Sequence, residues 1–204
     1  MSAKNNHRAV KHSRLSSTID FGKEWLGIPC SKEYFSKVGD VFNPLRSRTH
    51  QAWSSHPNKA RDVYVPVLEA FKVELERIYK LSPKDVASSL IEHLVGLKDF
   101  YKVIKLDNVV EIQAFNLRGD LGLPFQAQSA KFSVPKVSLP SEIIEISWKP
   151  GSQTTLIVKC NNCWELSFRI HNASSNIEPS LKFDISLIRS PSTLFSNTLT
   201  LPPE

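Results

Sequence analysis

The chain has 204 residues, of which 41% are apolar and 23% charged, and its formal net charge is +6. This composition is typical of a globular protein and excludes a disordered or fibrous chain. No apolar run reaches the ~20 residues of a transmembrane helix, so no membrane partner is expected. The basic N-terminus has no apolar signal segment behind it, and three cysteines are too few for a disulfide framework, so a cytoplasmic protein is expected.

The first segment, residues 1–19, contains no acidic side chain. It holds four cations and two imidazoles: Lys4, His7, Arg8, Lys11, His12 and Arg14. If the segment is helical, the four cations recur at three- and four-residue spacing and share one face, which suits a phosphate backbone. A solvated basic terminus explains the same residues equally well, so both interpretations stay open.

Residues 31–98 have the periodicity of α-helices. After Pro66, apolar side chains recur at three- and four-residue spacing as far as Ile78. Residues 82–85 (SPKD) form a strong helix start, in which the hydroxyl of Ser82 can cap the first turn. The sequence therefore predicts a helical middle region.

From residue 99 onward the periodicity changes to two. Alternating apolar and polar side chains predict strands at 101–106, 109–115, 143–148, 154–160, 164–171 and 181–188. The tail after Ser190 has little pattern and is expected to fray. The expected fold class is mixed α/β (α+β), with a helical middle region followed by a mainly antiparallel C-terminal sheet. Four regions are expected: a basic segment 1–30, a helical region 31–98, a β-rich region 99–190 and a tail 191–204.

Cys160 and Cys163 have the spacing of half a zinc site. A structural zinc site needs two further ligands, and the sequence offers only Cys30 and scattered histidines. Asn161-Asn162 lies where two strands must reverse, so a hairpin turn is the favoured explanation. No metal ligand is assigned.

Arg169, His171 and Asn172 lie on, or just after, the polar side of one predicted strand. Lys182 and Asp184 lie on the next strand, which is a candidate neighbour. Arginine and asparagine can pair with base edges, so these residues are candidates for contact with DNA. A solvent-facing network of Arg169 with Glu165 or Asp184 is the favoured alternative.

Four segments resemble the HaeIII family of restriction endonucleases, in the same order along the chain. They are residues 2–16 (SAKNNHRAVKHSRLS), 19–31 (IDFGKEWLGIPCS), 99–104 (DFYKVI) and 164–184 (WELSFRIHNASSNIEPSLKFD). Long strings of mixed residue types are more specific than isolated spaced residues. The similarity extends to about Ser196.

The resemblance implies an enzyme that cleaves double-stranded DNA at GGCC with Mg²⁺, using a nuclease core of the PD-(D/E)xK type. It assigns the catalytic lysine to Lys4 and places the basic segment along the DNA. It also implies metal-binding Asp and Glu residues upstream of Met1, so an incomplete core and an inactive fragment are expected. Asp20 and Glu24 are the nearest remaining carboxylates, and they are not expected to replace the pair.

Two other functions stay open. The first is a non-catalytic DNA-binding module with a sequence preference, in which the basic segment holds phosphates and Arg169, His171 and Asn172 read bases or shape. The second is an accessory subunit that docks onto a separate piece carrying the missing N-terminal part. A palindromic target would also suit a homodimer.

Overall fold

The computed structural model describes residues 2–5, 9–121 and 134–201, and of residues 2–5 and 9 it describes the backbone alone. The helices are α1 (Phe21–Leu26), α2 (Lys32–Arg46), α3 (Val65–Leu81) and α4 (Pro83–Val95), with short helical turns η1 (Trp53–Ser55) and η2 (Ala60–Tyr64). The strands are β1 (Ser2–Asn5), β2 (Ala9–Ser16), β3 (Phe100–Lys105), β4 (Val109–Phe115), β5 (Ile143–Trp148), β6 (Thr155–Cys160), β7 (Glu165–His171), β8 (Ser180–Arg189) and β9 (Phe195–Thr200). The prediction of a mixed α/β fold is confirmed.

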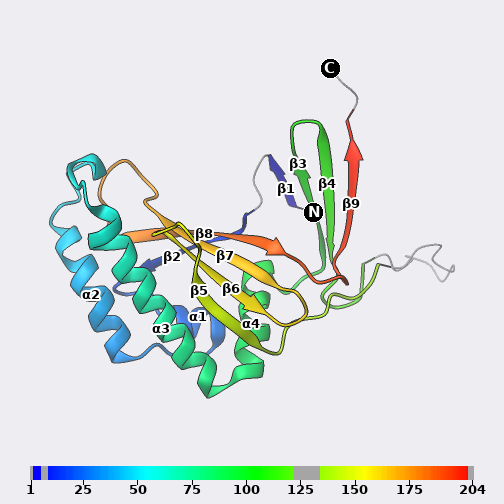
Figure 1. The fold of residues 1–204 in the computed structure, drawn as a ribbon, viewed down its shortest axis with the longest axis horizontal. Helices are drawn as coiled ribbons and strands as arrows, with labels where there is room; N and C mark the ends of the chain where they lie inside the picture. Colours follow the sequence, from blue (N-terminus) through cyan, green and yellow to red (C-terminus); the bar gives the residue numbers. More distant parts are fainter. Residues whose placement is uncertain (1, 6–8, 122–133, 202–204) are drawn as a thin grey trace.

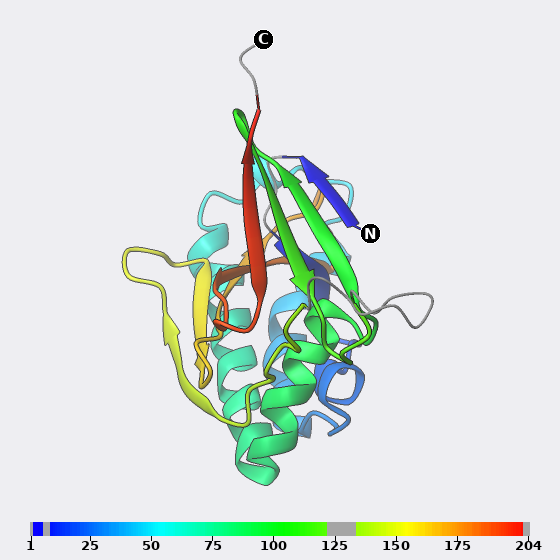
Figure 2. The same ribbon diagram turned by 90° about the vertical axis from the view of Figure 1, so that its right-hand side faces the viewer.

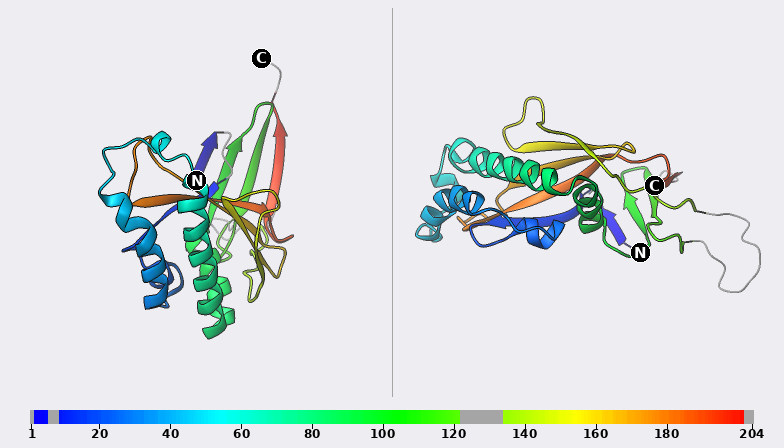
Figure 3. Two further views of the ribbon diagram at one scale, coloured as in Figure 1. Left: turned by 60° about the vertical axis from the view of Figure 1, so that its left-hand side comes forward. Right: turned by 90° about the horizontal axis from the view of Figure 1, so that it is seen from below.

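A five-stranded antiparallel sheet, in the order β2-β8-β7-β6-β5, forms the centre of the molecule. The four helices gather on one side of it (Figures 1 and 3). Alternation along the strands explains this arrangement, because Leu181, Phe183 and Ile185 of β8 are fully buried while the residues between them are partly exposed. One cluster of buried side chains joins the helices to this sheet, so the helical and β-rich regions share a core.

The second sheet has four strands in the order β1-β3-β4-β9. It stands upright beside one end of the five-stranded sheet, with the helices below (Figure 2). β1 is parallel to β3, and the other pairings are antiparallel. The strands predicted at 101–106 and 109–115 are confirmed as β3 and β4, which pair antiparallel across a turn that contains Asp107 and Asn108.

The prediction that the tail frays was wrong for residues 195–200. These residues form β9, which pairs with β4 from Phe195 opposite Ala114 to Thr200 opposite Val109. Most side chains of β9 are exposed, so backbone hydrogen bonds rather than apolar burial hold the strand. Because neither face of β9 is buried, its sequence lacks the alternation of apolar and polar residues that would have predicted a strand.

The helical form considered for the basic segment is not found in residues 9–16, because they form strand β2. Within this strand Ser13 and Leu15 are buried, whereas His12 and Arg14 are exposed. This period of two fits a strand that pairs with β8 and covers the core with one face. The three- and four-residue spacing of the cations therefore does not place them on one face.

The other strand predictions are confirmed to within about two residues, and three helices fall in the predicted helical region. The Asn161-Asn162 turn is confirmed as well, and Asn162 and Cys163 adopt left-handed φ angles of 56° and 63°. Ser82 precedes α4 as predicted, but its hydroxyl donates to the Asp85 carboxylate at 2.7 Å instead of accepting from the backbone. None of the described helices has both the length and the apolar character that crossing a bilayer requires.

Candidate nucleic-acid interface

Six polar side chains from three adjacent strands lie on the side of the five-stranded sheet that the helices leave open. We call this surface the polar sheet face: His12 and Arg14 of β2, Lys182 and Asp184 of β8, and Arg169 and His171 of β7. The register aligns them in two rows, because His12 is opposite Asp184 and Asp184 is opposite Arg169. In the next row Lys182 lies between Arg14 and His171.

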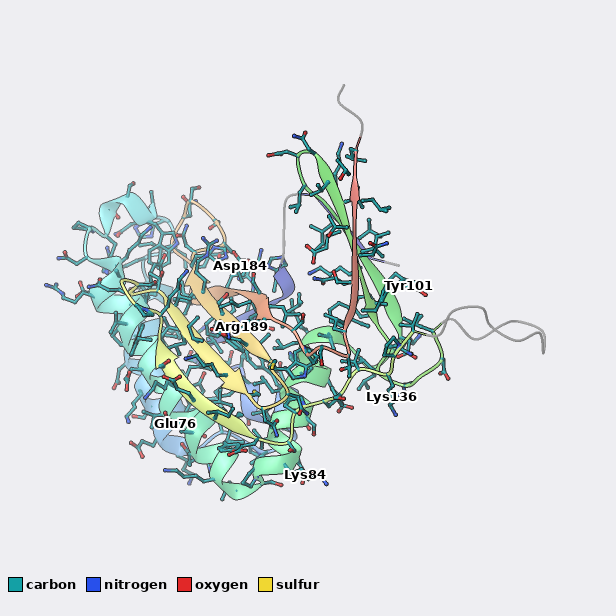
Figure 4. The ribbon with its side chains drawn as sticks, turned by 45° about the vertical axis from the view of Figure 1, so that its right-hand side comes forward. Glu76, Lys84, Tyr101, Lys136, Asp184 and Arg189 are labelled. Atoms are coloured by element: carbon teal, nitrogen blue, oxygen red, sulfur yellow. The ribbon has the colours of Figure 1, made fainter. Side chains whose placement is uncertain are left out.

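Asp184 is the centre of this surface. Its Oδ2 accepts a hydrogen bond from Arg169 Nη2 at 2.8 Å, and His12 Nδ1 lies 2.6 Å from its Oδ1. His171 Nε2 lies 3.0 Å from Oδ2, at the distance of an ion pair but without the alignment of a hydrogen bond. Figure 4 shows Asp184 on the upper side of the sheet, opposite Glu76 and Lys84 of the helical layer.

The electrostatics of Asp184 favour its charged form. Burial raises the pKa of this carboxyl, but the Arg169 guanidinium and the two imidazoles outweigh burial and lower the pKa to about 2. Asp184 is therefore ionised at any pH at which the protein is expected to work. Of the two alternatives that the sequence left open for Arg169, the structure shows the pair with Asp184, whereas Glu165 lies 3.4 Å from Arg189.

Arg14 and Lys182 supply the remaining positive charge of the polar sheet face. Arg14 Nη1 donates to Ser180 Oγ at 2.7 Å and lies 3.6 Å from Glu178 Oε2. Ser180 begins β8, so these contacts hold the guanidinium at the edge of the sheet. Such exposed ion pairs contribute little to stability, about 0–1 kcal/mol, and exchange easily for a phosphate partner.

Lys11 lies on the opposite side of β2. Its Nζ donates to the backbone carbonyl of His93 in α4 at 2.7 Å, and partial burial lowers the pKa of Lys11. The His93 ring stacks on Trp25 at 5.0 Å, and burial followed by the charge of Lys11 lowers the pKa of His93 to about 4. Lys11 therefore links the sheet to the helical layer, on the side of β2 that faces away from the polar sheet face.

Asn172 follows β7 and is held by protein contacts. Its Oδ1 accepts from the Tyr64 hydroxyl at 3.0 Å, and its Nδ2 donates to the carbonyl of Ser174. Burial raises the pKa of Tyr64, so the hydroxyl remains a donor at neutral pH. The amide of Asn172 thus fixes the loop beside His171 rather than pointing a free donor and acceptor outward.

Lys4 lies in the other sheet, where its backbone is paired with Ile104 of β3. Its side chain, and all of His7 and Arg8, fall outside the described residues. Asp20 caps α1 by accepting from the backbone amides of Lys23 and Cys30, both at 2.9 Å. Asp20 and Glu24 thus lie in the helical layer, at the N-cap and in the first turn of α1.

The described residues do not fit a divalent metal. Among them no group of three or more His, Cys, Asp or Glu side chains is arranged to hold an ion. Asp184, His12 and His171 are residue types that can bind metals, but the Asp184 carboxylate already faces nitrogen atoms of three side chains, and Arg169 would repel a cation.

Sequence reasoning missed the central place of Asp184 and the contacts of Glu178 and Tyr64. The pairing of β2 with β8 joins segments far apart in the chain, so the sequence alone did not place His12 beside Asp184. The alternation in 164–171 and 181–188 was the available signal, and it correctly put Arg169, His171, Lys182 and Asp184 on one polar side.

The fold and this surface define a protein of a recognisable class: an α+β protein that presents cations and imidazoles on an open antiparallel sheet, as suits a polyanionic partner. The model of the HaeIII restriction endonuclease family matches residues 1–191. Type II restriction enzyme HaeIII from Haemophilus aegyptius is 42% identical over 198 residues, which are 95% of this chain and 62% of that enzyme. The chain belongs to the HaeIII restriction endonuclease family.

The chain thus spans less than two thirds of the length of the curated relative that it matches. No solved structure matches it.

Proposed function

We propose that this chain is the DNA-binding part of a type II restriction endonuclease that cleaves double-stranded DNA at GGCC with Mg²⁺. Family membership carries the proposal, together with the polar sheet face, which lies largely within the segments that resemble the family. Two copies would suit the two-fold symmetry of a palindromic target.

Within this proposal the polar side chains have different roles. Arg14 and Lys182 neutralise phosphates, and Arg169 contacts base edges. The ring nitrogens of His171 face Asn172 and Asp184, so this side chain senses groove shape rather than reading a base edge. His7, Arg8 and the catalytic lysine Lys4 would extend the contact toward the scissile phosphate. We assign Lys11 and Asn172, which the sequence made DNA-binding candidates, to supporting roles because their polar atoms contact the protein.

The second part of the proposal concerns cleavage. Because the described residues do not fit a metal site, we propose that the metal-binding carboxylates of the enzyme are not among them. The same observation supports the alternative that this chain acts as a non-catalytic DNA-binding module or as the accessory subunit of a split nuclease.

A gel-shift experiment tests both parts. The purified chain is mixed with a GGCC duplex and with a scrambled duplex of the same composition, with and without added Mg²⁺. We expect tighter binding to the GGCC duplex and no cutting in any lane. Equal binding to both duplexes would contradict the assigned specificity, and Mg²⁺-dependent cutting would contradict the proposed absence of the metal ligands.

Replacing Arg169 with alanine is expected to reduce the preference for GGCC by about 1–3 kcal/mol, because one base contact is lost. Competition between the GGCC duplex and the scrambled duplex measures this preference directly. If the variant and the wild type discriminate equally, Arg169 serves only as the ion-pair partner of Asp184.

A further inference from the structure

The carboxylate of Asp184 organises the polar sheet face. It contacts nitrogen atoms of three side chains, one on β2 and two on β7, so it ties three strands together on their open side. All three partners carry or can carry positive charge, and two of them are imidazoles. The protonation of these imidazoles therefore decides how much charge the surface presents.

His171 has an acceptor beside each ring nitrogen. Its Nδ1 lies 2.7 Å from the carbonyl oxygen of Asn172, which can only accept, so Nδ1 carries a proton. Nε2 faces the Asp184 carboxylate at 3.0 Å. A lone pair on Nε2 would repel the carboxylate oxygen, whereas a second proton would turn the contact into an ion pair. The place of His171 thus suits the imidazolium form.

Both imidazoles lie among other charged groups. Asp184 and Lys182 face them from β8, Arg169 lies beside His171 on β7, and Arg14 lies beside His12 on β2. Glu178 approaches Arg14 from the loop before β8, and Tyr64 reaches the neighbourhood through Asn172. At the register position of Arg169, β6 contributes the uncharged Thr155.

Protonation would change the charge of this surface strongly. Three cations (Arg14, Arg169 and Lys182) and two carboxylates (Asp184 and Glu178) give +1 when both imidazoles are neutral. Two imidazolium ions raise this sum to +3. A polyanion bound here would favour the second state, so binding and proton uptake are coupled.

We propose that Asp184 is a positioning residue for DNA binding and that duplex DNA binds the polar sheet face with uptake of protons by His12 and His171. The proposal rests on the proposed function, because it takes duplex DNA as the occupant of this surface. By its charge alone the Asp184 carboxylate would weaken DNA binding, whereas as a positioning residue it supports binding.

The test is the affinity for a fluorescent GGCC duplex without Mg²⁺ at fixed salt, measured between about pH 6 and 8, where free imidazoles titrate. Duplex phosphates stay ionised throughout this range. We expect wild-type affinity to rise about tenfold as the pH falls, because two more cations contact the duplex. For Asp184→Asn we expect the rise to be displaced to lower pH, since an imidazolium ion at either position would lose the carboxylate that lies 2.6 or 3.0 Å away.

Glu178→Gln is the matched control. It removes the same charge from the same surface without touching either imidazole, so affinity should rise slightly at every pH with the profile unshifted. The double variant His12→Gln/His171→Gln should lose most of the pH dependence. Circular dichroism at each pH checks the fold, and NMR titration of the imidazole signals without DNA gives an independent measurement of the Asp184→Asn effect.

Superimposable pH profiles of Asp184→Asn and wild type, with unchanged imidazole titrations, would overturn the proposal. Full pH dependence in the double histidine variant would overturn it too. These failures leave the proposed function standing, because the wild type still binds the duplex. Absence of duplex binding at every pH would instead contradict both the proposed function and this inference.

Discussion

Replacing Phe71 with alanine is expected to lower the free energy of unfolding by about 3–5 kcal/mol. Phe71 of α3 is fully buried, and its ring lies 4.7 Å from that of Phe21 and 5.1 Å from that of Phe183. It also contacts Trp25 and Phe168. One ring therefore joins the helical layer to β7 and β8, the two strands that carry most of the polar sheet face.

Urea denaturation followed by circular dichroism measures this loss. Val73→Ala is the control, because Val73 lies in the same helix and is 42% exposed, so its truncation should change stability by less than about 0.5 kcal/mol. A change below about 1 kcal/mol for Phe71→Ala would mean that the aromatic cluster does not join the layers as described.

Replacing Glu74 with alanine is expected to lower the free energy of unfolding by about 3 kcal/mol. The buried carboxylate accepts hydrogen bonds from the amide and hydroxyl of Ser31 at 2.6 and 2.8 Å. It also accepts from Nε and Nη2 of Arg77 at 3.0 and 2.7 Å. Its removal would leave the donors at the start of α2 without their acceptor. Glu76→Ala is the control, because this more exposed residue is paired only with Lys72 in the described contacts.

The pH dependence of stability provides a second measurement on Glu74. Burial raises the pKa of this carboxyl, but the hydrogen bonds from Arg77 and Ser31 outweigh burial and hold the pKa below its usual 4.5. The charged form therefore stabilises the fold above that value, and this contribution is lost as the pH falls through the lower pKa of the folded state. Thermal unfolding should show that Glu74→Ala loses less stability than the wild type as the pH is lowered. Equal losses of stability in the two proteins on acidification would contradict the stabilising role of the charged Glu74.

Much of the fold could be predicted from the spacing of apolar residues, which recur at every second position in strands and at every third or fourth position in helices. This spacing arises because one face of each element is buried. The departures in β2 and β9 have physical causes. In β2 the spacing of the cations suggested a helix. Ser13 and Leu15 are both buried, however, and residues two positions apart share a face in a strand but not in a helix. In β9 the strand is held by its backbone, which leaves no pattern in side chains.

The candidate site could be predicted only in part. Local alternation placed Arg169 and His171 correctly, because the residues of one strand alternate regardless of its partner. The position of His12 beside Asp184 depended on a long-range register that no local pattern specifies. Lys11 and Asn172 are cationic or polar like the others, and only the tertiary contacts show that their polar atoms point to the protein.

The salt dependence of duplex binding tests most directly whether the polar sheet face is the DNA-binding surface. Affinity is measured against salt concentration for the wild type and for Arg14→Ala/Lys182→Ala. We expect weaker binding to every duplex, and a log–log slope that is less steep by about 2, because two phosphate contacts are lost. An unchanged slope and affinity would show that DNA, if bound, contacts another surface of the chain.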